Sequence, residues 1–470
     1  MKSSSGEPAD DKAAPQLRTG SLRLIETVGQ SLALIGPTLT PALNVTVVVA
    51  LAGIGCWMSY LIGTVGVVIV AASVGILAAR HPEAGSYFIY VGRSFGPYAG
   101  AMAGWAMISA YLCTAIAVAF SFAIFLSDFL AAVGIRVTLP AAYVALFAFV
   151  VIVTYAAYRD VRLSSRIGLL MEVVAITIIV TITILIIRVK GAVIDPVQLN
   201  LGALHYGAVL SALPFVIFSF VGFESSATLA KESANPRRNI PFAVVGCAAF
   251  AGVFFTVISY FMVFGSGDDT AMLGKSSAPF GDVAAAAGFR WAAAIVYFGA
   301  LISVFACCLA SINAAARLLF SMGKYQFLHR SMGRVHGTHR TPHRAILLSG
   351  GLLSAAIFAM LPLGFLDAFG YAGTIASFGF VVVYFSLCIV APMDLRKTAE
   401  MKIRHVVAGV LGAALMLFVV VGSVYPAPAY PYNRLPYWFI GYLLLGGIWF
   451  AVLRAKSPQT LVAIQHDMEG

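Results

Sequence analysis

The stretch "FVGFESS", from Phe220 to Ser226, places a glycine and a carboxylate inside a long apolar segment. Pro214 precedes it within the same segment. Glycine weakens a helix because its backbone has many alternative conformations, and proline removes a backbone hydrogen-bond donor. The sequence therefore predicts a helix that is interrupted at this point, with the acid Glu224 at the interruption.

The composition of the chain indicates that this helix lies in a membrane. Of the 470 residues, 60% are hydrophobic and only 10% are charged, and the mean hydropathy is +0.93. Soluble domains carry about 25% charged residues, and a helix needs ~20 apolar residues to cross a bilayer. We therefore predict an all-α membrane protein with twelve transmembrane helices. The predicted helices lie near residues 24–50, 54–79, 97–127, 138–158, 163–187, 206–230, 240–264, 291–321, 344–361, 367–392, 406–425 and 437–454.

The distribution of positive charge predicts the orientation of these helices. The N-terminal tail and every second connection after it carry 24 of the 30 Lys and Arg residues. Short positively charged connections stay on the cytoplasmic side. Both termini are therefore expected inside, with residues 1–23 and 456–470 as cytoplasmic tails of a multi-pass protein of the plasma (inner) membrane. The polar residues 1–23 lack the apolar core of a cleaved signal peptide.

A second interruption is predicted in the first helix, where "LIGPTLTPALN" runs from Leu34 to Asn44. The two interrupted helices, 1 and 6, are five apart, so two five-helix units would enter the membrane from opposite sides. We predict an inverted repeat of residues 24–188 and 206–392, followed by helices 11 and 12 within 406–455. Matching interruptions in inverted halves indicate a transporter binding site, because unwound backbone in a membrane must line a cavity or be buried.

Three stretches of the chain closely resemble the amino acid–polyamine–organocation family of secondary transporters. They are "ARHPEAGSYFIYVGRSFGPYAGAMAGW" (79–105), "GFESSATLAKESANPRRNIPFAV" (222–244) and "ACCLASINAAARLLFSMGK" (306–324). The resemblance covers helices 1 to 10, and helices 11 and 12 fit by position. It implies a five-plus-five inverted repeat in which helices 1, 3, 6, 8 and 10 surround the substrate.

The resemblance also implies which residues bind the substrate. Phe218 matches an aromatic residue that covers the substrate, and backbone amides at the helix 1 interruption would accept a carboxylate. Pro37 departs from this pattern because it removes one of those amides. The residues expected to bind the substrate are Ser31, Gly36, Thr38, Thr40, Phe218, Val221, Gly222 and Thr374.

Two acids within predicted helices are candidates for proton coupling. An acid at the bilayer centre is costly to insert and is a functional candidate by default. Glu224 could carry a proton, pair with a substrate amine, or be a structural acid bonded to freed backbone groups. Glu172, in helix 5, could act likewise or simply bond to a neighbouring helix.

The coupling ion remains open between a proton and sodium. Many sodium-independent relatives have a lysine in helix 5, and Ala175 stands at that position here. Sodium would need oxygen ligands from helices 1 and 8. Helix 8 offers Ser303 and Ser311, but the thiols of Cys307 and Cys308 between them are poor sodium ligands.

These observations predict a secondary active transporter that moves amino acids or related small amines by alternating access, with proton linkage. The alternatives are a polyamine or organic amine transporter, a substrate exchanger, and a non-transporting receptor. An enzyme is not expected, since the sequence has no H-E-x-x-H motif or clustered catalytic set, and the absence of G-x-x-x-x-G-K-[ST] argues against an ATP-driven pump. We expect no cofactor, metal or nucleic acid. The partners expected are the lipid bilayer, a small-molecule substrate and the coupling ion.

Overall fold

The computed structural model describes residues 17, 19–82, 86–159, 161–276, 278–425 and 428–456, and within these ranges it contains helices and no strand. Most of the two predicted tails lies outside the described residues. The helices are α1 (Leu24–Ile35), α2 (Val45–Ala52), α3 (Cys56–Arg80), α4 (Ser86–Phe95), α5 (Pro97–Ala132), α6 (Leu139–Arg159), α7 (Val161–Lys190), α8 (Tyr206–Ser211), α9 (Leu213–Phe220), α10 (Pro236–Ser266), α11 (Thr270–Leu273), α12 (Pro279–Ala286), α13 (Ala292–Lys324), α14 (His343–Met360), α15 (Phe365–Lys397), α16 (Ile403–Val424) and α17 (Leu435–Lys456).

Short turns of tighter or wider helix connect several of these elements. The turn Thr40–Asn44 is π-helical. The 3₁₀ turns are Gly53–Gly55, Leu201–Ala203, Ser225–Glu232, Arg330–Gly333, Leu361–Leu363 and Tyr432–Arg434.

Eleven helical stretches of the described chain are long and apolar enough to cross a membrane. The first of them, Leu24–Arg80, contains both of the first two predicted spans, and the other ten match the remaining predictions one by one. Several helices are longer than predicted; α5, for example, ends at Ala132 and α15 at Lys397. The backbone hydrogen bonds of these helices continue past the predicted ends of the spans.

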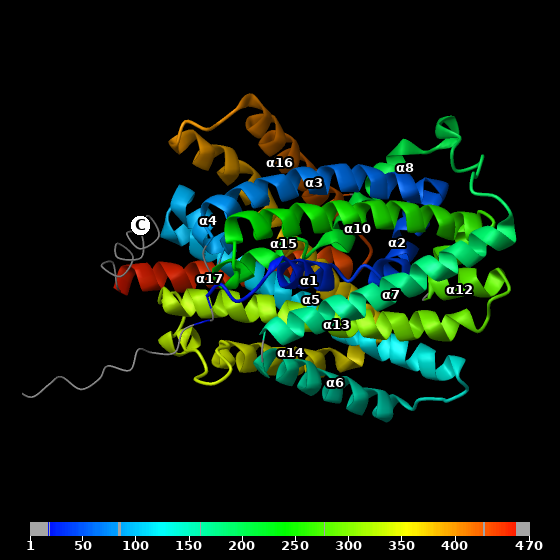
Figure 1. Ribbon diagram of the computed structural model, residues 1–470, viewed down its shortest axis with the longest axis horizontal. Helices are drawn as coiled ribbons and strands as arrows, with labels where there is room; N and C mark the ends of the chain where they lie inside the picture. Colours follow the sequence, from blue (N-terminus) through cyan, green and yellow to red (C-terminus); the bar gives the residue numbers. More distant parts are fainter. Residues whose placement is uncertain are drawn as a thin grey trace, which may run out of the picture.

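The helices divide into an enclosed group and an outer group. The most enclosed span is Leu213–Glu232, of which 89% of the apolar window is buried, whereas only 17% is buried for Tyr432–Ala455. α5 lies at the centre and packs against α13 and α15. In Figure 1, α6 and α14 run together along the lower edge and α16 lies at the upper edge. The outer helices expose apolar side chains, as lipid contact requires.

Both predicted interruptions are present as breaks in the helical backbone. Predicted helix 1 corresponds to α1 and α2, predicted helix 6 to α8, α9 and the turn Ser225–Glu232, and predicted helix 8 to α13; these predicted numbers are kept for the helix 1 and helix 6 breaks. α1 ends at Ile35, and Gly36 follows with a φ of 56°, in the left-handed region that favours glycine. α9 ends at Phe220, and Gly222 has a φ of 98°. The two breaks touch: a Cβ added to Gly222 would lie 1.9 Å from Leu34 Cδ2. Gly222 is therefore required both for its backbone conformation and for this close approach.

The connection between α7 and α8 is hydrogen-bonded to the last turns of α10. The backbone N–H of Asp195 donates to the Tyr260 hydroxyl at 2.6 Å, and the Gln198 side chain donates to an Asp195 carboxylate oxygen at 2.6 Å. Asp268, just beyond α10, interacts with the same Asp195 carboxylate. Burial and the neighbouring Asp195 raise the pKa of Asp268 to about 6, and Lys190 offsets this only in part.

Candidate functional site

Glu224 is fully buried at the helix 6 break and accepts hydrogen bonds from three donors. The Tyr111 hydroxyl of α5 donates to Oε1 at 2.9 Å, and the Tyr384 hydroxyl of α15 donates to Oε2. The backbone N–H of Gly222 also donates to Oε2, at 3.2 Å. An ionised carboxylate is an acceptor only, so this set of donors suits the charged form. Among the described residues, no Lys, Arg or His forms an ion pair with Glu224.

A third tyrosine extends the cluster toward α4. The Tyr87 hydroxyl donates to the backbone carbonyl of Glu224 at 2.7 Å and lies 3.3 Å from the Tyr111 hydroxyl. Each hydroxyl has one proton, so Tyr111 donates either to Glu224 or to Tyr87, and not to both. The proton of Tyr111 can therefore change partner without any movement of the backbone. We call Glu224, Tyr87, Tyr111 and Tyr384 the acid–tyrosine cluster.

Sequence reasoning predicted Glu224 and missed the three tyrosines. All three are fully buried, although their hydroxyls are polar. A tyrosine inside an enclosed span needs a partner for its hydroxyl. That requirement is the one signal in the sequence that could have marked them, but it does not say which partner each would find.

Residues before the helix 1 break and after the helix 6 break join the two helices. The Ser226 N–H donates to Ser31 Oγ at 3.0 Å, and the Ser225 hydroxyl donates to the Gln30 carbonyl at 3.2 Å. Ser31, predicted to bind substrate, is thus engaged with the opposite break. Val221, also predicted to bind substrate, follows the last residue of α9 and is buried, with 5% of its surface exposed.

The helix 1 break offers two free hydroxyls. Thr38 Oγ1 and Thr40 Oγ1 are buried and have no hydrogen-bond partner in the described chain. The Gly36 N–H instead donates to the Leu32 carbonyl at 3.2 Å. Gly36 therefore supplies the bend of the backbone, and the amide expected from it for a ligand is already in use. Buried hydroxyls without partners are costly, so Thr38 and Thr40 are suited to receive a ligand.

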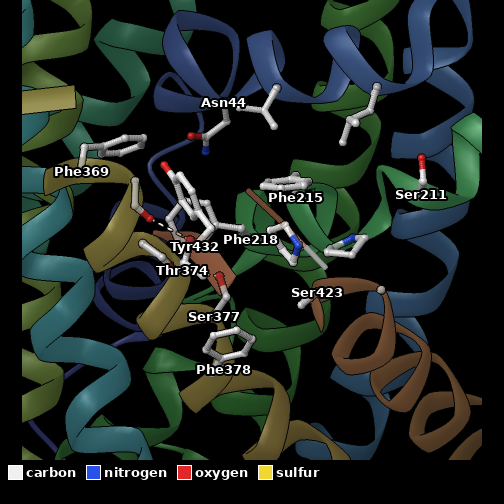
Figure 2. A pocket seen from close by; sticks show the side chains of 17 residues that line it. Asn44, Ser211, Phe215, Phe218, Phe369, Thr374, Ser377, Phe378, Ser423 and Tyr432 are labelled. Carbon is white, nitrogen blue, oxygen red and sulfur yellow. Dashed lines mark hydrogen bonds between the residues drawn. The ribbon is translucent and has the colours of Figure 1, made fainter. Parts of the chain in front are cut away.

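A cavity of about 490 Å³ lies on the other side of the breaks from the acid–tyrosine cluster. On helix 1 its lining begins at Asn44, after the break, and on helix 6 it ends at Phe218, before the break. Figure 2 shows the Phe218 ring inside the cavity, close to Thr374 of α15. The other predicted site residues do not line it. The lining residues are Asn44, Val47, Leu51, Ser211, Pro214, Phe215, Phe218, Phe369, Gly370, Gly373, Thr374, Ser377, Phe378, Gly422, Ser423, Pro428 and Tyr432.

Glu172 is buried beside the helix 1 break, and only one of its two carboxylate oxygens has a hydrogen-bond partner in the described chain. The Ser303 hydroxyl of α13 donates to Oε1 at 2.7 Å, while Oε2 has no hydrogen-bond partner in the described chain. The Cys307 thiol, one turn further along α13, donates to the Leu34 carbonyl at 3.0 Å. The Ser311 hydroxyl donates to the Cys307 carbonyl at 2.8 Å. The four helix 8 groups weighed as sodium ligands, Ser303, Cys307, Cys308 and Ser311, thus all donate hydrogen bonds within the protein, and the two hydroxyl oxygens keep lone pairs for a cation.

Ion pairs and a short backbone bridge connect the start of helix 1 and the end of helix 6 with neighbouring segments. Arg317 of α13 pairs with Glu232 at 2.7 Å, and the two side chains are 1% and 2% exposed. Leu22, before α1, donates its N–H to the Glu232 carbonyl at 2.9 Å and accepts from the Ala234 N–H at 2.7 Å. Glu26 of α1 pairs with arginines of α7. The Leu22 bridge thus ties the start of helix 1 to the end of helix 6, and the ion pairs tie these two segments to α7 and α13.

Comparisons with known proteins agree with this architecture. The family model described as "Amino acid permease" matches residues 30–458. The branched-chain amino acid permease BcaP of Bacillus subtilis is 25% identical over 348 residues, which cover 71% of this chain and 73% of BcaP. The glutamate/serine transporter AimA of Bacillus subtilis is 26% identical over 395 residues, covering 78% and 71%. The low-affinity putrescine importer PlaP of Escherichia coli is 25% identical over 308 residues, covering 64% and 66%.

The family match extends over most of the chain, including both breaks, the acid–tyrosine cluster and the cavity. It accords with the many apolar helices of a multi-pass membrane protein. The chain belongs to the amino acid permease family, and it is a membrane transporter rather than an enzyme.

Proposed function

We propose that the chain is a proton-linked secondary transporter of amino acids that works by alternating access. The observation that carries this proposal is the Glu224 carboxylate, which is buried at a helix break, bonded by three donors and paired with no cation in the described chain. A buried charge without a counter-ion is costly, and a proton or a cationic ligand would remove that cost.

Protonation of Glu224 would loosen its connections. A protonated carboxyl must donate one hydrogen bond, so one of its present donors has to turn away. Tyr111 can do this, because the Tyr87 hydroxyl lies 3.3 Å away as an alternative acceptor. The Tyr111 oxygen would then accept a hydrogen bond from the protonated carboxyl, so the bond between the helix 6 break and α5 would reverse its direction and would no longer involve a charged group. Because hydrogen bonds to charged groups are the stronger ones, proton uptake at Glu224 would in this way favour movement of helix 6 relative to α5.

Glu172 is proposed as a second site for the coupling ion. Its free Oε2 lies in a span next to the helix 1 break, where a proton could neutralise it. Sodium is the alternative ion at this place, since a carboxylate oxygen and carbonyls freed at a break are ligands that it accepts.

Helix packing supports the proposed inverted repeat of twelve helices. In a five-plus-five repeat, α3, α5, α6 and α7 of the first half correspond to α10, α13, α14 and α15 of the second half, and α1 corresponds to α9. Each contact between two helices should then have a counterpart between the two corresponding helices. α6 packs against α13 and α14 packs against α5; α7 packs against α13 and α15 packs against α5. α1 likewise packs against α10 as α9 packs against α3. This exchange of partners is the pattern expected for two halves of the same fold. The charge asymmetry of the connections supports cytoplasmic termini, and we place the chain in an inner or plasma membrane.

An amine or polyamine transporter, or an exchanger of such substrates, is the second candidate function. The anionic cluster without a counter-ion would suit an ammonium group, and one relative is a putrescine importer. In that case the substrate itself would supply the positive charge at Glu224.

Substitutions at the breaks test the placement of the substrate. Thr38→Val removes a hydroxyl that has no partner in the described chain, so the fold should be retained. If the substrate binds that hydroxyl, uptake into proteoliposomes and ligand-induced thermal stabilisation should both fall. Phe218→Ala should have the same effect by removing the ring next to the break. Thr154→Val is a matched control, because Thr154 Oγ1 of α6 is also buried without a partner and does not line the cavity. If both variants at the breaks behaved like this control, the placement would be wrong.

A further inference from the structure

The cavity beside the breaks is lined by apolar groups and carries no charge. None of the 17 described residues that line it is Asp, Glu, Lys, Arg or His. Figure 2 shows Asn44 at one end and Phe378 at the other, with the rings of Phe215, Phe218 and Tyr432 between them. A volume of about 490 Å³ falls within the range of small-molecule sites.

Most hydroxyls in the lining are already engaged with their own helices. Thr374 donates to the Gly370 carbonyl at 2.8 Å, and Ser377 donates to the Gly373 carbonyl at 2.9 Å. Ser211 and Ser423 bond to backbone carbonyls in the same way. Of the lining side chains, only Asn44 and Tyr432 bring further polar groups. An ionised group placed in this cavity would therefore lose its hydration and would find few hydrogen-bond partners and no opposite charge among the described lining residues.

The position of the cavity connects it to both breaks. Asn44 ends the π-helical turn that follows the helix 1 break, and Phe218 lies just before the helix 6 break. A ligand whose charged head group is held at the breaks can thus extend its other end into the cavity. At that end it meets aromatic rings and small residues.

We propose that this cavity receives the apolar side chain of a neutral amino acid, and that it excludes ionised side chains and diamines. This inference rests on the proposed transport function and specifies its substrate class. Apolar side chains gain free energy in proportion to the surface they bury against these rings. A carboxylate or a second ammonium would have to be buried without a partner.

Contact between Phe218 and Gly373 sets the width of the cavity. A Cβ added to Gly373 would lie 2.8 Å from Phe218 Cζ, so the ring rests directly on the glycine. Gly373→Ala would push the ring into the cavity and reduce the space for a side chain. Phe218→Ala would enlarge it. The two substitutions should change the preference for substrate size in opposite directions.

The experiment measures uptake of labelled leucine into proteoliposomes that contain the full chain. Unlabelled leucine, isoleucine, phenylalanine, alanine, glutamate and putrescine are added as competitors. We expect the apolar amino acids to compete at least about tenfold better than glutamate or putrescine, as a well-fitted apolar pocket allows. Gly373→Ala should weaken competition by phenylalanine more than by alanine, and Phe218→Ala should do the reverse. Gly351→Ala is the control, because a Cβ at Gly351 of α14 would have nothing within 4 Å.

If glutamate or putrescine competes better than the apolar amino acids, the substrate class is wrong while the transport function stands. If Gly373→Ala and Gly351→Ala give the same order of competitors, the cavity does not select the side chain and the proposal fails. Binding measured by thermal stabilisation separates a variant that folds but does not transport from one that does not fold. Absence of flux for every amino acid and amine tested would overturn both this inference and the proposed function.

Discussion

Replacing Glu224 by Gln separates the three roles that this acid could have. The amide can keep the shape of the site: its oxygen can take the place of Oε2, where Tyr384 and the Gly222 N–H donate. Its NH₂ group would then face Tyr111, which accepts that bond and turns its own proton to Tyr87, 3.3 Å away. Tyr111 thus accepts from one of the two amide N–H groups, and the donors at Oε2 keep their acceptor, so we expect the variant to fold and to reach the membrane.

The variant loses the charge and the ability to titrate. A hydrogen bond to a charged group contributes about 1.5–3 kcal/mol, and Tyr111 loses one such bond, which corresponds to a roughly 10- to 150-fold change in an equilibrium that depends on it. If Glu224 carries the coupling proton, uptake of substrate should no longer depend on pH. Exchange of one substrate molecule for another should persist, because it needs no net movement of protons.

The assay compares pH-dependent uptake, exchange and binding for wild type and Glu224→Gln in proteoliposomes. If Glu224 pairs with a substrate amine, binding itself should weaken, by about 2–5 kcal/mol for a buried charge pair that loses one member. Tyr111→Phe is the control, since it removes one donor and keeps the acid, so it should move the pH profile of uptake without abolishing it. Wild-type behaviour of the Gln variant in all three measurements would refute a functional role for Glu224.

Three further predictions concern orientation and stability. In a cysteine-free background, Ser266→Cys should be labelled by an impermeant reagent from outside, and labelling only from inside would reject the cytoplasmic placement of the termini. Arg317→Ala should lower the free energy of unfolding by roughly 3–5 kcal/mol, because it leaves Glu232 buried and unpaired, and adding Glu232→Gln should restore part of the loss. Because the pKa of Asp268 is raised to about 6, folded wild type holds a proton that the unfolded chain releases, so its stability should fall as pH rises from about 4 to about 6. The melting temperature of Asp268→Asn should therefore rise relative to wild type between pH 4.5 and pH 7, and an unchanged difference would contradict this.

The helices and the two breaks were predictable because they depend on local sequence. Apolar length determines the spans, and a glycine within such a span, as at Gly36 and Gly222, indicates where the backbone leaves the helix. The single run Leu24–Arg80 shows the limit of such counting: its α1, α2 and α3 follow one another too closely for length alone to divide them. The number of twelve spans stays a prediction.

The composition of the site was only partly predictable because it depends on tertiary packing. Glu224 is conspicuous as an acid in an apolar segment, whereas its partners Tyr87, Tyr111 and Tyr384 come from three distant helices. Nothing in their local sequence indicates that they converge. The cavity also receives residues such as Ser423 and Tyr432, from segments beyond the predicted inverted repeat.

The contacts between the two breaks have a mechanical consequence. The half of helix 1 before its break and the half of helix 6 after its break are the inner halves in the proposed orientation. They are held together by the Ser31 and Ser225 bonds, by the Leu22 bridge, and by Leu34 against Gly222. The outer halves, α2 and α9, line the cavity and make none of these four contacts. The inner halves should therefore rock as one rigid block, with the breaks as a double hinge. In the proposed alternating-access cycle, such a linkage would let the outer mouth close while the inner mouth is still shut, which is the condition for a passage that is never open from end to end.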